Sequence, residues 1–263
     1  MCGIWGAANV ADRQVAERAA AALHPRGPDD PGIYASREPQ PVLLANTRLA
    51  IIDLSEAGHQ PMSTADGRYW IVYNGEVYNY QEVRAQLLDI GHHFRSDSDT
   101  EVVLHAYVEW GERCLERLRG MFAFAVWDRQ QAKLFAARDR LGIKPLYYAE
   151  PGGGRFVFGS ELKALLASGL VEPRLNHPAL HHYLSFYAVP SPYTLLEGVE
   201  ALPPGHYLTF QAGRLRVQQY WWLPAAEPLQ ADAHEIALRL RALLEESIRL
   251  RMIADVPLGA FLS

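Results

Sequence analysis

The second residue of the chain, Cys2, could supply both a nucleophile and the base that activates it. A small residue after the initiator methionine predicts removal of Met1, which leaves Cys2 with a thiol and a free α-amine. A cysteine thiol has a pKa of about 8.5, whereas an α-amine titrates at about 7.7–8.0. The amine can therefore accept the thiol proton, directly or through one water. Taken alone, however, Cys2 is better explained as a small apolar residue of an N-terminal strand.

Other chemically interesting residues have simpler explanations. The histidines at 92–93 and 181–182 are adjacent pairs, which lack the spacing of a histidine metal site and are interpreted as solvated or packing residues. Cys114 falls on the apolar face of a predicted helix. The glycines at 152–154 lack the Gly-Lys-Ser/Thr sequence of a phosphate loop and predict a hairpin tip. The sequence therefore predicts no metal site.

The elements that would position Cys2 are short strands and three helices. The spacing of Ser98 and Glu101 is that of a capping box and marks the start of the third helix. The helices are predicted at 12–23, 80–90 and 100–118. Short apolar runs between turn residues predict mainly antiparallel strands at 42–52, 69–73, 121–127, 133–138, 146–149, 156–158, 207–210 and 215–220. Blocks of strands and helices without regular βαβ units indicate the α+β class.

The amino-acid composition changes beyond Ala188, where prolines become frequent. Asp232, followed by Glu235, then predicts the start of a long amphipathic helix. Its apolar face has no downstream sequence to cover it before Ser263, so we expect the start of a truncated second domain.

Composition limits the function classes. The 263 residues have 25 basic and 30 acidic side chains, a net charge of −5, and no basic stripe, so nucleic acid is not an expected partner. No run approaches the roughly 20 apolar residues of a membrane helix, and no export signal stands at the N-terminus. Two cysteines argue against a disulfide framework and favour a cytoplasmic location.

A series of short motifs raises the importance of Cys2. They include Cys-Gly-Ile-Trp-Gly at the N-terminus and Gly-Ile-Lys-Pro-Leu-Tyr-Tyr before the predicted strand at 146–149. The full series lies at residues 2–6, 26–29, 48–53, 59–62, 73–76, 98–101, 138–148 and 158–164. In this order and spacing the chain resembles the class II (N-terminal nucleophile) glutamine amidotransferases, and asparagine synthetases in particular.

This resemblance implies a four-layer αββα sandwich of antiparallel sheets. It places a glutaminase domain at residues 2–213. Residues 214–263 would then be a linker and the first helix of a truncated α/β ATP-pyrophosphatase domain. The final residues, 256–263, resemble the approach to a pyrophosphate-binding loop, which makes Leu262 a nucleotide-binding candidate.

The dipeptide Asn74-Gly75 has two interpretations. Its position between strand-like runs predicts a type I′ hairpin turn. The resemblance implies an oxyanion hole formed by the Asn74 amide and the Gly75 backbone N–H, donors that stabilise the negative oxygen formed during attack on an amide. The interpretations are compatible, because a tight turn can aim two donors at one point.

The resemblance also implies a binding site for the head group of glutamine. Arg48 would hold the α-carboxylate, for which guanidinium has bidentate geometry, although a surface ion pair is the usual role of a strand arginine. Asp99, in the first turn of a helix, could simply complement the helix dipole. By resemblance Asp99 binds the α-ammonium group, with Glu76 close by. One cation and two anions suit a zwitterionic amino acid.

The implied reaction is hydrolysis of glutamine to glutamate and ammonia through a thioester on Cys2, with no cofactor. In a complete synthetase, the ammonia would convert aspartate to asparagine with ATP and Mg²⁺, and a homodimer is a possible assembly. Two alternatives stay open: an amidotransferase of the same architecture that aminates another acceptor, and a catalytically silent dimerisation or regulatory module.

Overall fold

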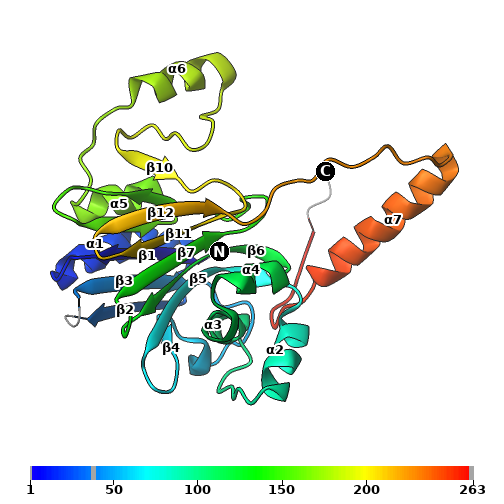
Figure 1. Cartoon of the computed structure of the whole chain (residues 1–263), viewed down its shortest axis with the longest axis horizontal. Helices are drawn as coiled ribbons and strands as arrows, with labels where there is room; N and C mark the ends of the chain where they lie inside the picture. Colours follow the sequence, from blue (N-terminus) through cyan, green and yellow to red (C-terminus); the bar gives the residue numbers. More distant parts are fainter. Residues whose placement is uncertain (1, 37–39, 261–263) are drawn as a thin grey trace.

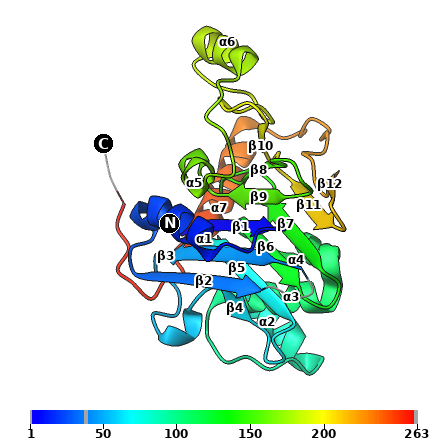
Figure 2. The ribbon, with the colours of Figure 1, turned by 90° about the vertical axis from the view of Figure 1, so that its left-hand side faces the viewer.

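The computed structural model describes residues 2–36 and 40–260 and contains two antiparallel sheets (Figures 1 and 2). Among these residues, the first sheet has the strand order β10-β8-β9-β1-β3-β2. Its strands are β1 (Gly3–Ala8), β2 (Asp30–Ser36), β3 (Val42–Arg48), β8 (Tyr147–Ala149), β9 (Phe156–Gly159) and β10 (Val199–Ala201). Strand β1 therefore lies inside the sheet, between β3 and β9, and its N-terminal end carries Cys2.

The second sheet has the order β12-β11-β7-β6-β5-β4. Its strands are β4 (Met62–Ser63), β5 (Tyr69–Val77), β6 (Gly120–Asp128), β7 (Lys133–Arg138), β11 (His206–Gln211) and β12 (Arg214–Gln219). The long strands β5 and β6 pair over nine residues each, which gives the part of this sheet beside Cys2 a rigid frame.

Helices cover the outer faces of both sheets. Helices α1 (Arg13–Leu23) and α5 (Leu162–Ser168) pack on the first sheet. Helices α2 (Tyr80–Asp89), α3 (Asp99–Trp110) and α4 (Cys114–Arg117) pack on the second. Short 3₁₀ helices occur at η1 (His24–Arg26), η2 (Glu56–Gly58) and η3 (Gly111–Arg113).

The hydrophobic core has three layers, because both sheets are buried on both faces. Successive side chains of a strand point to opposite faces. In β1, Ile4 faces the second sheet, whereas Trp5 faces α1 and α5, and both are fully buried. In β5, Val72 points between the sheets and Tyr73 points toward α3. The predicted α+β class and four-layer αββα sandwich are confirmed.

Two local predictions are wrong. The predicted turn at Asn74-Gly75 is absent, because β5 continues through both residues, which pair with Ala123 and Phe122 of β6. The predicted helix at 100–118 is broken at Gly111, whose φ of +57° lies outside the helical region. The chain then restarts as η3 and α4. Strands β2, β4 and β10 and helices α5 and α6 (His177–Phe186) were not predicted.

Helix α7 (Ala233–Leu250) begins where the sequence predicts, with the Asp232 side chain accepting a hydrogen bond from the Glu235 N–H at 2.9 Å. None of its side chains is buried, and it extends away from the sheets (Figure 1). After it, the chain returns to the sheets, and the Asp255 side chain accepts a 2.7 Å hydrogen bond from the N–H of Asp53, in the loop after β3. Strand β12 pairs with β11; the domain division between residues 213 and 214 stays a prediction.

No helix within residues 2–36 and 40–260 combines the length and apolar character required to cross a bilayer.

Candidate active site

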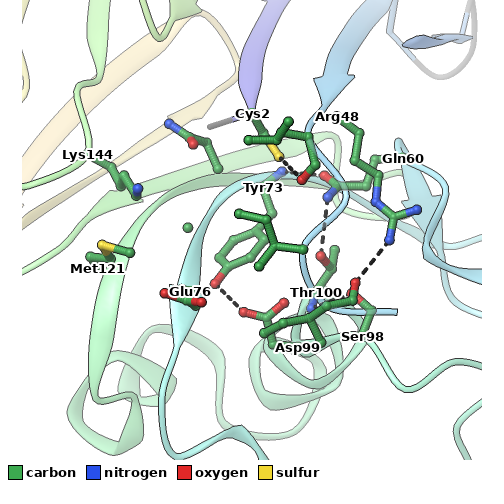
Figure 3. A pocket seen from close by; sticks show the side chains of 15 residues that line it. Cys2, Arg48, Gln60, Tyr73, Glu76, Ser98, Asp99, Thr100, Met121 and Lys144 are labelled. Carbon is green, nitrogen blue, oxygen red and sulfur yellow. Dashed lines mark hydrogen bonds between the residues drawn. The ribbon is translucent and has the colours of Figure 1, made fainter. Parts of the chain in front are cut away.

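A cavity of about 120 Å³ lies at the N-terminal end of β1 (Figure 3). It is lined by Cys2, by the end of β3 and the loop that follows, by Gln60, and by the second half of β5. The start of α3, Met121 of β6 and the loop before β8 complete its wall. A space of this size is suited to a small molecule. The fold thus brings together Cys2, Arg48, Asn74, Gly75, Glu76 and Asp99, the residues that the sequence singled out for chemistry.

Two hydrogen bonds hold Cys2 at the N-terminal end of β1. Its Sγ lies 3.8 Å from the carbonyl oxygen of Leu49, to which the thiol donates, and its own carbonyl accepts a 2.9 Å hydrogen bond from Arg26 Nε. Arg26 is in turn fixed by a 2.8 Å ion pair with Glu161. Burial raises the pKa of the Cys2 thiol, so the thiol needs a nearby base to become a nucleophile. Met1 lies outside the described residues.

The Asn74 side chain is 1% exposed, yet neither its Nδ2 nor its Oδ1 has a hydrogen-bond partner within the described part of the chain. Buried amides in folded proteins are normally paired, and an unpaired one is destabilising by roughly 1–3 kcal/mol. Asn74 lines the same cavity as Cys2. Its amide is therefore available to a polar atom of a ligand.

Gly75 is required by close packing and not by a turn. A Cβ at this position would lie 2.5 Å from the Met121 carbonyl oxygen and 2.8 Å from Phe122 Cα on β6. The absence of a side chain lets β5 and β6 approach while leaving the backbone beside Asn74 open to the cavity.

Asp99 is the first residue of α3, whose N-cap Ser98 accepts a hydrogen bond from Thr100 N. One carboxylate oxygen accepts hydrogen bonds from Tyr73 Oη at 2.6 Å and from Val77 N at 2.9 Å. Burial raises the pKa of Asp99 despite these donors. A cationic ligand group would restore the solvation that this carboxylate lacks.

Glu76 adds a second carboxylate to the cavity. Burial, and then the charge of Asp99, raise the pKa of Glu76, whereas the ammonium of Lys144 opposes that shift. Two buried acids, one of which raises the pKa of the other, favour binding of a cation beside them. The spacing of Ser98 and Glu101 predicted the start of α3 correctly. The Glu101 carboxylate, however, accepts hydrogen bonds from the backbone N–H groups of Arg95 and Ser96.

Arg48 is buried, at 5% exposure, so its interpretation as a surface ion pair is wrong. Its guanidinium donates hydrogen bonds to the carbonyl oxygens of Ile52 at 3.1 Å and Ser55 at 3.2 Å, and to that of Asp53. A Cβ on Gly58 would clash with this guanidinium. Arg48 thus shapes the loop that follows β3 while also lining the cavity.

Sequence reasoning missed several polar residues of the cavity, among them Gln60, Thr100 and Lys144. Gln60 donates to Thr100 Oγ1 at 3.2 Å and accepts from Tyr73 N at 2.7 Å, which ties β5 to the start of α3. Lys144, from the loop before β8, also lines the cavity and is 5% exposed. All lie within the motifs noted above, and their polar character beside apolar neighbours was the available signal.

One of the two histidine pairs has side-chain partners on α3. His92 contacts His105 Nδ1 at 2.9 Å and Glu109 at 3.0 Å, on the outer side of α3. Residues 2–36 and 40–260 contain no group of three or more histidine, cysteine or acidic side chains arranged to hold a metal ion. Leu262 lies outside the described residues.

Comparison with known proteins agrees with this geometry. A family model described as a glutamine amidotransferase domain matches residues 1–221. Glutamine-hydrolysing asparagine synthetase 3 of Bacillus subtilis is 39% identical over 271 residues, which cover 100% of this chain and 43% of that protein. Amidase chry2 of Gibberella zeae is 39% identical over 242 residues, which cover 90% of this chain and 35% of that protein. This chain spans less than half the length of either relative.

Among solved structures, glutamine phosphoribosylpyrophosphate amidotransferase from Bacillus subtilis superposes with a TM-score of 0.64 at 20% identity, over 84% of this chain and 49% of that one. At this identity the likeness establishes the fold. The sequence match and the two-sheet sandwich agree with each other and with the cavity at Cys2. The chain therefore belongs to the class II glutamine amidotransferase family, and residues 1–221 match its domain.

Proposed function

We propose that this domain hydrolyses glutamine to glutamate and ammonia, with Cys2 as the nucleophile. The observation that carries the proposal is the buried, unpaired amide of Asn74 in the same cavity as the Cys2 thiol. Attack on a carboxamide creates a negative oxygen, and a preorganised donor without a competing partner stabilises that charge.

The first half-reaction forms a thioester. After loss of Met1, the α-amine of Cys2 accepts the thiol proton, and the thiolate attacks the carboxamide carbon. The oxygen becomes negative and accepts hydrogen bonds from Asn74 Nδ2 and the Gly75 backbone N–H. The carbon–nitrogen bond then breaks, the α-ammonium returns its proton to the leaving nitrogen, and ammonia departs.

The second half-reaction restores the enzyme. The α-amine takes a proton from water, whose oxygen attacks the γ-glutamyl thioester carbon. The same two donors stabilise the negative oxygen, the carbon–sulfur bond breaks, and the thiolate is reprotonated. Glutamate is released, and Cys2 is ready for another substrate.

Three charged residues would hold the α-amino-acid end of glutamine. Arg48 would bind the α-carboxylate with guanidinium donors that its loop contacts leave free, since three donor contacts go to carbonyls of residues 52–55. Asp99 and Glu76 would bind the α-ammonium group. Their burial, which raises both pKa values, is the property expected of acids that await a cation.

We further propose that the ammonia serves a synthetase reaction of the complete protein, the conversion of aspartate to asparagine with ATP and Mg²⁺. The printed name of the Bacillus subtilis relative supports this acceptor. In this scheme residues 2–213 are the glutaminase domain, residues 214–263 lead into the synthetase domain, and Leu262 lies near the nucleotide. The assembly could be a homodimer, and an unoxidised Cys2 fits a cytoplasmic setting.

A different acceptor is the second candidate. Amidase chry2 and the asparagine synthetase are both 39% identical to this chain over their matched residues, so a similar domain occurs in a relative with another printed name. Both candidates share the glutaminase chemistry and differ in the fate of ammonia.

The test is a coupled assay of ammonia and glutamate with glutamine as sole substrate, combined with intact mass measurement. We expect equal amounts of the two products and a mature chain that begins at Cys2. A fully active protein that retains Met1 would contradict the use of the α-amine as base. A properly folded chain that releases no ammonia would favour the silent-module alternative.

A further inference from the structure

We propose that Lys144 is a further functional residue of this site, a buried cation that sets the reactivity of Cys2 without contacting the head group of glutamine. The inference rests on the proposed function, because it assigns Lys144 to the service of the Cys2 nucleophile. Its role is a positioning role, exerted through the electric field in the cavity.

The backbone fixes Lys144 at the cavity wall. Its N–H donates to Asp139 Oδ2 at 2.9 Å, and its carbonyl accepts from Arg138 Nε at 2.7 Å. Asp139 is itself buried, at 1% exposure, and also binds the N–H groups of Leu141 and Ile143. The loop before β8 is therefore braced from within, and it presents the Lys144 side chain to the cavity (Figure 3).

The ammonium group of Lys144 is without a fixed partner. The side chain is 5% exposed, and no described residue forms a hydrogen bond or ion pair with its Nζ. The other lysines of the sequence, Lys133 and Lys163, pair with Glu112 at 3.2 Å and Glu161 at 2.8 Å. The Lys144 ammonium lies at the cavity wall without a fixed partner, so it is free to interact with a charge that forms inside the cavity.

The position of Lys144 separates it from Arg48, the residue proposed to hold the α-carboxylate of glutamine. Figure 3 shows Lys144 and Met121 on the side of the cavity opposite Arg48, with Cys2 between them. Glutamine held at Arg48 and Asp99 would direct its carboxamide toward Cys2 and thus toward Lys144. The ammonium of Lys144 consequently acts on the reacting end of the site.

The charged groups around Cys2 determine how readily its thiol loses a proton, and Lys144 is one of them. Acids in the cavity disfavour loss of the thiol proton, and cations favour it. The charged and titratable groups that face Cys2 or Lys144 include Arg26 of η1, Arg48 of β3, Tyr73 and Glu76 of β5, Asp99 of α3 and Asp139. Loss of Met1 would add the α-amine of Cys2 to this set. Arg26 and Arg48 are occupied by an ion pair and by carbonyl oxygens, respectively. Lys144 is the cation of this set that lacks such a partner among the described residues.

The charges around Lys144 act in the direction that the proposal requires. Burial lowers the pKa of Lys144, and the charges of Glu76 and Cys2 oppose that shift, which means that a thiolate at Cys2 and the ammonium of Lys144 stabilise each other. Removing the ammonium would leave the negative charges of Glu76 and Asp99 without this compensating cation. The pKa of the Cys2 thiol would therefore rise. The same loss would raise the pKa of the α-amine and reduce the fraction of free base at neutral pH.

The test measures the reactivity of Cys2 without requiring turnover. The rate of alkylation by iodoacetamide is followed at the Cys2 peptide by mass spectrometry over a range of pH, in the unaltered chain and in Lys144→Met and Lys144→Arg. We expect the midpoint of the rate profile to rise by roughly half a pH unit or more in Lys144→Met and to return in Lys144→Arg. Lys133→Met, which removes a lysine outside the cavity, should leave the midpoint unchanged.

Steady-state kinetics supply the second readout. In Lys144→Met, kcat with glutamine should fall while KM stays nearly constant, because the head-group contacts remain. Thermal unfolding checks the fold; methionine fills the same space without a buried charge, and Lys144→Gln serves if that variant does not fold.

An unchanged alkylation midpoint in the neutral variants would overturn the proposal, as would a shift that arginine fails to reverse. A chain that shows the expected midpoints but releases no ammonia would refute the proposed function and leave the influence of Lys144 on Cys2 intact.

Discussion

Replacing Cys2 with alanine is expected to abolish ammonia release from glutamine while leaving glutamine binding nearly unchanged. The thiol is the group that would form the covalent intermediate, and its removal leaves no nucleophile of comparable strength in the cavity. The head group of glutamine would still contact Arg48 and Asp99, which lie on other elements. Coupled ammonia detection measures the first effect, and calorimetric titration with glutamine measures the second.

Cys114 provides the matched control. It is fully buried in the core behind the second sheet, and burial raises the pKa of its thiol strongly, so it is inert toward substrate. Cys114→Ala should retain turnover and lose only some stability. Ammonia release by Cys2→Ala at a rate close to that of Cys114→Ala would show that the nucleophile is another group.

Replacing Asn74 with alanine is expected to lower kcat by about 10²–10³-fold, the usual effect of removing one oxyanion donor. The affinity for glutamine should change little, because Asn74 would act on the negative oxygen formed during the reaction. The substitution should not reduce thermal stability in proportion to its burial, since the lost amide has no hydrogen-bond partner among the described residues.

Asn79 is the comparison residue for this test. Its amide lies outside the cavity and is fully used: Nδ2 donates to the Arg117 carbonyl at 2.9 Å, and Oδ1 accepts from Arg119 N at 2.9 Å. Asn79→Ala should therefore lower stability by about 0.5–1.5 kcal/mol and leave kcat intact. The opposite pattern, with Asn74→Ala active and unstable, would make Asn74 a structural residue.

Parts of the fold could be predicted because local chemistry determines them. The capping side chains of Ser98 and Asp232 mark the starts of α3 and α7, and the structure places both caps at those positions. The alternation of apolar residues and turns predicted the antiparallel strands, and β7 spans the predicted residues. The candidate site residues were found through motifs, because most of the segments that line the cavity carry one of these motifs.

Other features depend on contacts distant in sequence. Asn74-Gly75 has the sequence of a turn, but nine residues of pairing between β5 and β6 outweigh that local preference. The burial of Arg48 depends on a loop that folds back over its guanidinium. Lys144 is brought to Cys2 by a turn that Asp139 organises from inside. A local sequence pattern does not reveal contacts between segments that are distant along the chain.

The helix predicted at 100–118 was correct in its buried face and wrong in its continuity, because it is broken at Gly111. Tyr107 and Cys114 share the apolar periodicity of one long helix, and both are buried against the second sheet. The positive φ of Gly111 lets the chain change direction between them without losing either contact. Periodicity therefore predicted the buried face correctly and the continuity of the helix wrongly.

The most direct test of the account is to capture the covalent intermediate. The chain is mixed with glutamine, quenched in acid during turnover, digested, and examined by mass spectrometry at its N-terminal peptide. The account predicts one γ-glutamyl group on the Cys2 peptide, present with glutamine, absent with glutamate alone, and absent in Cys2→Ala. Ammonia release at an undiminished rate with the γ-glutamyl group on a different residue would contradict the assignment of Cys2.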